Sequence, residues 1–151
     1  MIRTKLAGMG LMAFALMAGS VAVPTNGNAA DPGHMRIQNA SKYRMTYVVP
    51  DNDNWANCCD APKPGFAVVD VAPNSTSDYF LFVRTDGHGC NGKQGQFGMI
   101  PSIPVGDAPQ EQQFWFDSHG GLAFQGPNPN YASQLIDEGN HNYKWIVTPT
   151  Q

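Results

Sequence analysis

The sequence predicts an all-β fold, a single-domain antiparallel β-sandwich of about eight strands. Short runs rich in β-branched and aromatic residues alternate apolar and polar positions, and turns rich in glycine, proline and asparagine separate them. After residue 30 no stretch keeps a 3.6-residue apolar period for three turns, and no internal repeat or linker divides the chain. Short strands at hairpin-like spacing are typical of a sandwich.

The first thirty residues have the pattern of a secretory signal peptide. Arg3 and Lys5 precede an apolar run over residues 6–17, and small residues follow it. This run is too short for a comfortable membrane span. We therefore expect a signal peptide over 1-30, a β-sandwich domain over 31-151 and a secreted protein, extracellular or periplasmic.

The composition of the expected mature chain excludes some partners. Seven Lys and Arg remain against twelve Asp and Glu, which gives a formal net charge of −5. Binding to nucleic acid needs clustered cations that neutralise phosphates, so we expect no nucleic-acid partner. The same charge argues against binding anionic lipid by charge alone.

Four strands are predicted in the first half of the domain. Residues 35–39 and 43–49 alternate apolar with polar side chains, and Pro50 ends the second run. Asp, Asn and Pro are too dense over 51–64 for a helix or a central strand, so this segment is a predicted loop. The next two predicted strands are 65–71 and 78–84.

The second half begins with a glycine-rich loop over 85–95. A strand over 96–100 follows, and Pro101 should stop it because proline has no backbone N–H. Residues 126–137 are rich in Pro and Asn and are a predicted loop with one helical turn near 132–136. The remaining predicted strands are 111–117, 122–125 and 141–148.

Three cysteines allow at most one intramolecular disulfide. Export makes such a bridge plausible, with Cys90 bonded to either Cys58 or Cys59. A vicinal bridge between Cys58 and Cys59 would be strained. The remaining thiol is expected to be buried, because no nearby base would activate it.

The chain carries more aromatic rings than one face of each strand can bury. Fifteen Phe, Trp and Tyr follow residue 30. In Phe114-Trp115-Phe116, strand alternation sends at least one ring to the opposite face from the others. Exposed Trp and Tyr suit membrane interfaces and sugar rings alike. An ordinary bulky core is the alternative interpretation.

Catalytic and metal-binding patterns are weak. Asp117, Ser118 and His119 are adjacent, but neighbours in a strand point to opposite faces and do not converge into a triad. His88 and Cys90 could begin a metal half-site, but no second half with ligand spacing follows. We expect no enzyme, no cofactor and no metal site.

The order of features resembles the aegerolysin family of small β-sandwich proteins that bind particular membrane lipids. The resemblance covers about two thirds of the mature chain in short motifs. It departs from the family in its signal peptide, its cysteine order and the long loops at 101–110 and 126–140. The matching segments are Ile37-Gln38-Asn39-Ala40-Ser41, the loop around Trp55, Val71 to Thr76, Arg84 to Cys90, Gly95-Gln96-Phe97, Gln113 to Asp117 and Tyr143 to Val147.

This resemblance implies recognition of membrane lipid head groups, a pore-forming partner protein in some members, and no cofactor. We therefore expect a secreted lipid-binding protein, cytolytic with a partner, that uses aromatic loops. The rival is a secreted carbohydrate-binding or host-interaction module, and the third reading is a small metal-binding protein or hydrolase built on His88, Cys90 and His119. The expected lipid-contacting residues are Trp55, Trp115, Tyr131 and Trp145, with Arg84 as a phosphate partner.

Overall fold

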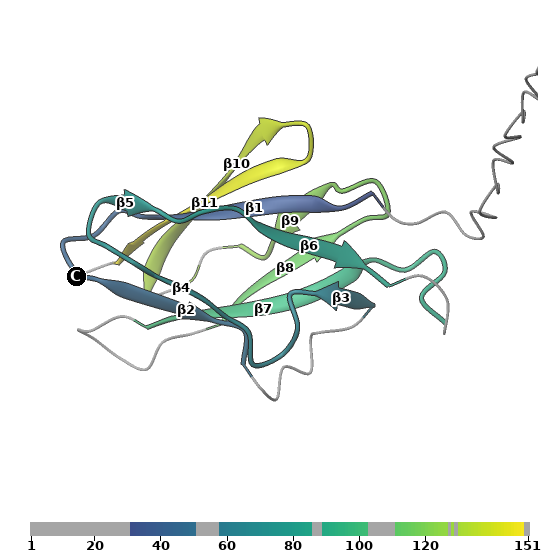
Figure 1. The fold of residues 1–151 in the computed structure, drawn as a ribbon, viewed down its shortest axis with the longest axis horizontal. Coiled ribbons are helices and arrows are strands. Elements are labelled where there is room, and N and C mark those ends of the chain that lie inside the picture. Colours follow the sequence, from purple (N-terminus) through teal and green to yellow (C-terminus); the bar gives the residue numbers. More distant parts are fainter. Residues whose placement is uncertain are drawn as a thin grey trace, which may run out of the picture.

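The protein is an all-β sandwich in which two sheets face each other (Figure 1). The computed structural model describes residues 31–50, 58–85, 89–102, 111–126, 128 and 130–149. The expected signal peptide lies outside these residues. The described part of the chain has no helix, so the predicted all-β sandwich is confirmed, and it has eleven strands where about eight were expected.

The first sheet has six strands and contains both ends of the described chain. Its order is β10-β11-β1-β6-β3, and β5 pairs separately with β1. The pair of β1 and β11 runs parallel, while the other ladders described in this sheet are antiparallel. The strands are β1 (Gly33–Asn39), β3 (Cys59–Ala61), β5 (Ser75–Thr76), β6 (Phe80–Arg84), β10 (Tyr131–Gly139) and β11 (Asn142–Pro149).

The second sheet has five strands in the order β4-β2-β7-β8-β9. Every ladder described in this sheet is antiparallel. The strands are β2 (Met45–Val48), β4 (Ala67–Val71), β7 (Gly95–Ser102), β8 (Gln112–Phe116) and β9 (Leu122–Phe124).

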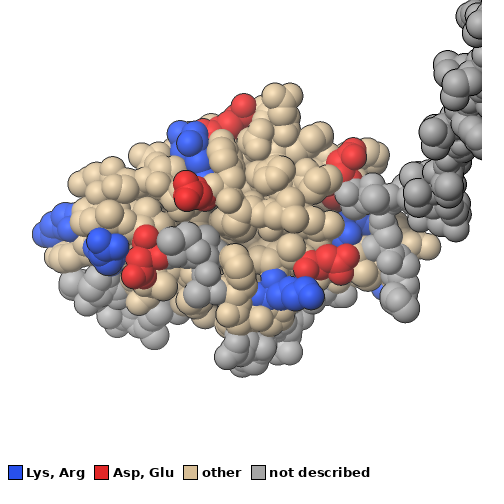
Figure 2. All heavy atoms as spheres, in the orientation of Figure 1, with Lys and Arg blue, Asp and Glu red and all other residues tan. Residues whose placement is uncertain are grey.

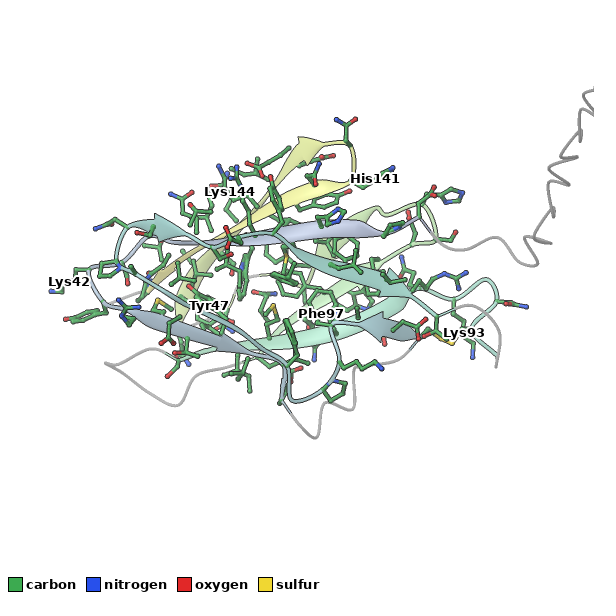
Figure 3. The ribbon with its side chains drawn as sticks, in the orientation of Figure 1. Lys42, Tyr47, Lys93, Phe97, His141 and Lys144 are labelled. Carbon is green, nitrogen blue, oxygen red and sulfur yellow. A yellow bond between two sulfur atoms is a disulfide. The ribbon has the colours of Figure 1, made fainter. Side chains whose placement is uncertain are left out.

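Alternating side chains of both sheets fill the core, as the sequence pattern predicts. In β8 the rings of Phe114 and Phe116 are buried while Trp115 points to the other face and is only partly buried. Edge-on ring contacts join the sheets: the centroid of Trp145 lies 5.6 Å from that of Tyr47 and 5.1 Å from that of Phe114. Figure 3 labels Tyr47 among the side chains between the layers. These rings pack with buried aliphatic and methionine side chains into one hydrophobic core.

Strand β10 was predicted as a loop with a helical turn, and this prediction is wrong. Along the first half of β10, inward and outward side chains alternate: Tyr131 is buried, and Ala132 and Gln134 are exposed. The ring of Tyr131 makes an edge contact with Trp145 of β11. The strand pairs along its length with β11. Small and polar residues weaken the period-two pattern in the sequence, and pairing with β11 across the two-residue turn Asn140-His141 decides the conformation.

Pro101 does not stop β7 as expected. The strand continues to Ser102, and Pro101 pairs with Tyr47 of β2. The described ladder with β8 ends at Met99, so at Pro101 the strand has a neighbour on one side only. Proline is tolerated where one side of a strand makes no ladder bond.

The disulfide links Cys58 to Cys90, which resolves the choice left open by the sequence. It fastens the start of β3 to the loop between β6 and β7. Cys59 keeps its thiol, is partly buried and packs against the core, with Sγ 3.0 Å from the carbonyl oxygen of Ala61.

A charged network lies on the outer face of the first sheet. The guanidinium of Arg36 donates two hydrogen bonds to the carboxylate of Glu138, from Nε at 2.8 Å and from Nη2 at 2.5 Å. The hydroxyl of Tyr79 donates to Glu138 Oε2 at 2.6 Å, and Lys144 Nζ lies 3.5 Å from Glu138 Oε1. Figure 2 shows basic and acidic side chains interspersed over the visible face.

This network should make stability depend on pH in the acid range. The hydrogen bonds from Arg36, and secondarily from Tyr79, lower the pKa of Glu138 from the ordinary 4.5 to about 2. As the pH falls the unfolded chain takes up this proton first, so the network's contribution is present above about pH 4.5 and is lost as the pH approaches 2. We expect Glu138→Gln to remove part of the loss in melting temperature between these pH values. An unchanged acid profile in Glu138→Gln would contradict this assignment.

Candidate functional site

The structure separates the five residues predicted to contact lipid. Trp55 lies outside the described residues. Tyr131 and Trp145 are fully buried, so the expectation that their rings face a membrane is corrected. The indole Nε1 of Trp145 also donates to Ser133 Oγ at 2.9 Å, which holds the ring inside the sandwich.

Arg84 is also not placed to meet a phosphate on a ligand. Its side chain is buried, with 8% of the residue exposed, and Nη1 donates to the carbonyl oxygens of Cys90 at 2.6 Å and Lys93 at 3.2 Å. The guanidinium therefore organises the glycine-rich loop that follows β6. The predicted role as a phosphate partner is replaced by this structural role.

Trp115 is the predicted residue that borders a pocket. The pocket has a volume of about 370 Å³, and its lining comes from β8 and β9 of one sheet and β10 and β11 of the other. Strands β9 and β10 end the two sheets, so the pocket lies where the sandwich is open. We call it the edge pocket. Its lining residues are Gln94, Trp115, Asp117, Gly121, Leu122, Ala123, Leu135, Asp137 and Tyr143.

Two carboxylates in the edge pocket are held by backbone groups. Asp117 Oδ1 accepts hydrogen bonds from the backbone N–H of His119 at 2.8 Å and of Gly121 at 2.9 Å. Asp137 Oδ1 accepts from the N–H of Gly139 at 2.8 Å. Asx turns of this kind fix the carboxylate orientation. Both carboxylates are therefore oriented before any ligand arrives.

Tyr143 brings a hydroxyl to the same place. Only 7% of Tyr143 is exposed, and burial raises the pKa of its phenol. A backbone hydrogen bond from Leu122 opposes this rise in the pKa, while the negative charges of Asp137 and Asp117 add to it. The phenol therefore stays neutral near pH 7 and can donate or accept a hydrogen bond.

Two turns near the edge pocket, at 118–121 and 140–141, are both fastened to the start of the described chain. The backbone N–H of Asp31 donates to the carbonyl oxygen of Ser118 at 3.0 Å, and that of His34 donates to the carbonyl of His141 at 2.8 Å. Gly120 has φ +75°, and a Cβ placed there would lie 2.9 Å from the ring of His141. Glycine at position 120 therefore allows its turn to approach the turn that carries His141.

The pocket lining contains no Lys, Arg or His among its described residues. It offers two carboxylates, a phenol, an amide from Gln94 and the indole of Trp115. These groups can hydrogen-bond hydroxyls and stack on an apolar ring face. A phosphate would find no positive partner among them.

The structure describes only some of the residues on which the hydrolase and metal interpretations rest. Asp117 Oδ1 accepts from the backbone of His119, not from its ring, while Ser118 Oγ lies 3.3 Å from His119 Nδ1. Cys90 is in the disulfide and has no thiolate to offer. His88 lies outside the described residues, and within the described ranges no three His, Cys, Asp or Glu side chains gather as a metal site.

Sequence reasoning missed most of the edge pocket. Asp117 was considered only as a catalytic neighbour of Ser118, and Asp137 was assigned to a loop. The signal that could have placed Leu135 and Asp137 on a strand is Gly139-Asn140, because glycine and asparagine favour a hairpin turn and the predicted strand over 141–148 follows directly.

Two further findings bear on the protein's class. In the described part of the chain, no helix is long and apolar enough to cross a membrane. No protein-family model matches the sequence, and no curated protein does either.

Proposed function

We propose that the protein is a non-enzymatic binding module that recognises a neutral, polyhydroxylated sugar head group in the edge pocket. The observation that carries this proposal is the partly buried indole of Trp115 in one pocket with two oriented carboxylates. Aromatic rings offer an apolar surface to the CH groups of a sugar, and carboxylates accept its hydroxyl protons. Membership of the aegerolysin family stays a prediction, and so do binding to a membrane lipid and action with a pore-forming partner protein.

The sugar can belong to a glycolipid or to a soluble glycan, since the head-group chemistry is the same. A glycolipid would fit the expected recognition of a membrane lipid head group. A soluble glycan would fit the alternative prediction of a carbohydrate-binding module. Phospholipid recognition is less well supported, because the pocket holds two acidic and no basic side chains. The disulfide between Cys58 and Cys90 is compatible with an exported protein.

Binding to sugars should depend on Trp115 and Asp137. We expect Trp115→Ala to weaken binding at least tenfold, about 1.4 kcal/mol, because the stacking surface is removed. Asp137→Asn should weaken binding less, because the amide still accepts one hydrogen bond. The measurement is flotation with vesicles that contain a neutral glycolipid, run beside a glycan panel that identifies soluble ligands.

Leu81→Ala is the matched control for nonspecific adsorption. Leu81 is 42% exposed and lies on β6, outside the edge pocket. The control should bind like the unmodified protein. Binding to plain phosphatidylcholine vesicles that survives both Trp115→Ala and Asp137→Asn would contradict the proposal, and so would sugar binding that Trp115→Ala leaves intact.

A further inference from the structure

The glycine-rich loop between β6 and β7 contains a tight turn with the sequence Cys90-Asn91-Gly92-Lys93. The backbone N–H of Lys93, which is labelled in Figure 3, donates to the carbonyl oxygen of Cys90 at 3.0 Å and closes the turn. The angle φ is positive at Gly92, at +73°, and not at Asn91, which defines a type II turn. Glycine is favoured at this third position because it adopts a positive φ without strain.

The two ends of the turn are fixed. A disulfide joins Cys90 to Cys58. The Nη1 of the buried Arg84 donates to the carbonyl oxygens of Cys90 at 2.6 Å and of Lys93 at 3.2 Å. One guanidinium therefore holds the first and the last residue of the turn together.

The two central residues of the turn face solvent. Asn91 and Gly92 are both exposed. No described residue accepts a hydrogen bond from the backbone N–H of Gly92. Beyond its two chain neighbours, no described residue comes within 4 Å of the place where a Cβ of Gly92 would stand. This is also the only Asn-Gly pair in the sequence after residue 30.

We propose that Asn91-Gly92 is a site of spontaneous covalent modification, at which the asparagine is converted to aspartate and isoaspartate through a cyclic imide. The reaction needs a backbone nitrogen that can reach the side-chain amide of the preceding asparagine. At Gly92 this nitrogen has no side chain beside it and lies in an exposed turn. The inference does not depend on the ligand of the edge pocket.

Water is the only co-reactant of the conversion. The backbone nitrogen of Gly92 gives its proton to hydroxide and bonds to Cγ of Asn91, while the bond from Cγ to the side-chain nitrogen breaks. That nitrogen takes a proton from water and leaves as ammonia. Water then opens the imide. Breaking the new bond to Cγ gives aspartate, and breaking the original peptide bond gives isoaspartate, without any change of oxidation state.

Asn74 is an internal comparison, because it is also exposed and also lies in a turn. The residue after it is Ser75, which has a side chain, and the backbone N–H of Ser75 donates to the carbonyl oxygen of Ala72 at 3.2 Å. The attacking nitrogen is therefore both engaged and shielded. We expect Asn74 to keep its amide under conditions in which Asn91 loses its own.

Isoaspartate should loosen the turn. It adds one carbon atom to the backbone between Cys90 and Lys93, whose carbonyl oxygens are both held by Arg84. We expect the hydrogen bond from the N–H of Lys93 to Cys90 to be lost, so that this amide exchanges faster with solvent than in the unmodified protein. Asn91→Asp is the matched control, since it adds the same negative charge to an unchanged backbone and should keep the slow exchange. Equal exchange in the isoaspartyl form and in Asn91→Asp would contradict this effect.

The test is incubation of the full disulfide-bonded protein for days in mildly alkaline buffer made with heavy-oxygen water. Proteolysis at acidic pH, where the imide forms slowly, and mass spectrometry follow. The peptide that contains Asn91 should show complete loss of the amide and gain one heavy oxygen atom, and an isoaspartyl methyltransferase should methylate part of it. In Asn91→Gln the corresponding peptide should stay unmodified, because the longer side chain closes a ring much more slowly.

A synthetic peptide of residues 89–94 with Cys90→Ser reports the reactivity of the same sequence without the fold. An amide retained at Asn91 in the protein but lost in this peptide would overturn the proposal, because the folded turn would then protect the site. Equal loss at Asn74 and Asn91 would also overturn it, since the exposed type II turn would then have no special role.

Discussion

Replacing Trp145 by alanine should lower the free energy of unfolding by about 3–5 kcal/mol, the usual cost of emptying a buried aromatic site. The indole is fully buried and contacts rings from both sheets: its centroid lies 5.6 Å from Tyr47 and 5.1 Å from Phe114 of the second sheet, and 6.3 Å from Tyr131 of the first. The variant also leaves Ser133 Oγ without its indole donor. Because small domains are stabilised by only about 5–15 kcal/mol, this variant should be close to unfolding at room temperature.

Denaturant unfolding followed by circular dichroism measures this loss. Trp115→Ala is the control, since it removes the same side chain from a partly buried position on the outer face of β8. It should cost less than about 1.5 kcal/mol, well below the core value. Equal losses of unfolding free energy in the two variants would contradict a buried Trp145 and a partly exposed Trp115.

Replacing Cys58 by serine should lower the free energy of unfolding by about 3–4 kcal/mol. The disulfide joins residues 32 positions apart, and opening a loop of this length increases the entropy of the unfolded chain. Cys90→Ser should produce a similar loss, because it opens the same loop. Both variants should be measured under conditions that keep the disulfide intact in the unmodified protein.

Cys59→Ser supplies the control for this prediction. The thiol of Cys59 lies next to Cys58 in the chain but outside the disulfide, so its replacement should preserve most of the stability. Mass spectrometry of the nonreduced protein after proteolysis should recover Cys58 linked to Cys90. A large loss in Cys59→Ser together with little loss in Cys58→Ser would contradict the observed pairing.

Alternation predicted the strands wherever large apolar residues mark the inner face. Residues 43–49 became β2 with Met45 and Tyr47 buried, and Phe114-Trp115-Phe116 became β8 with its middle ring turned outward. The same reasoning failed for β10, where inner-face Ser133 carries no apolar signal. That strand forms because it pairs with β11 in a hairpin that the two-residue turn Asn140-His141 closes.

The candidate site was harder to predict than the fold. An excess of aromatic residues indicated that some rings would be left outside, but composition gives no information about which ones: Phe66 and Tyr79 are exposed and Trp115 is partly buried. Trp145 is inside because β11 lies between β10 and β1, and that order is not visible locally. Asp137 and Tyr143 stand opposite each other in the hairpin of β10 and β11, and both line the edge pocket.

The most direct test of the proposed function is a titration of the three tryptophan indole N–H signals by nuclear magnetic resonance, using the sugar that binds best in the glycan panel. The proposal predicts that the Trp115 signal shifts progressively and saturates, while the Trp145 signal, bonded to Ser133 Oγ, stays in place and exchanges slowly with solvent. Saturable binding that leaves the Trp115 signal unchanged would contradict a ligand site in the edge pocket.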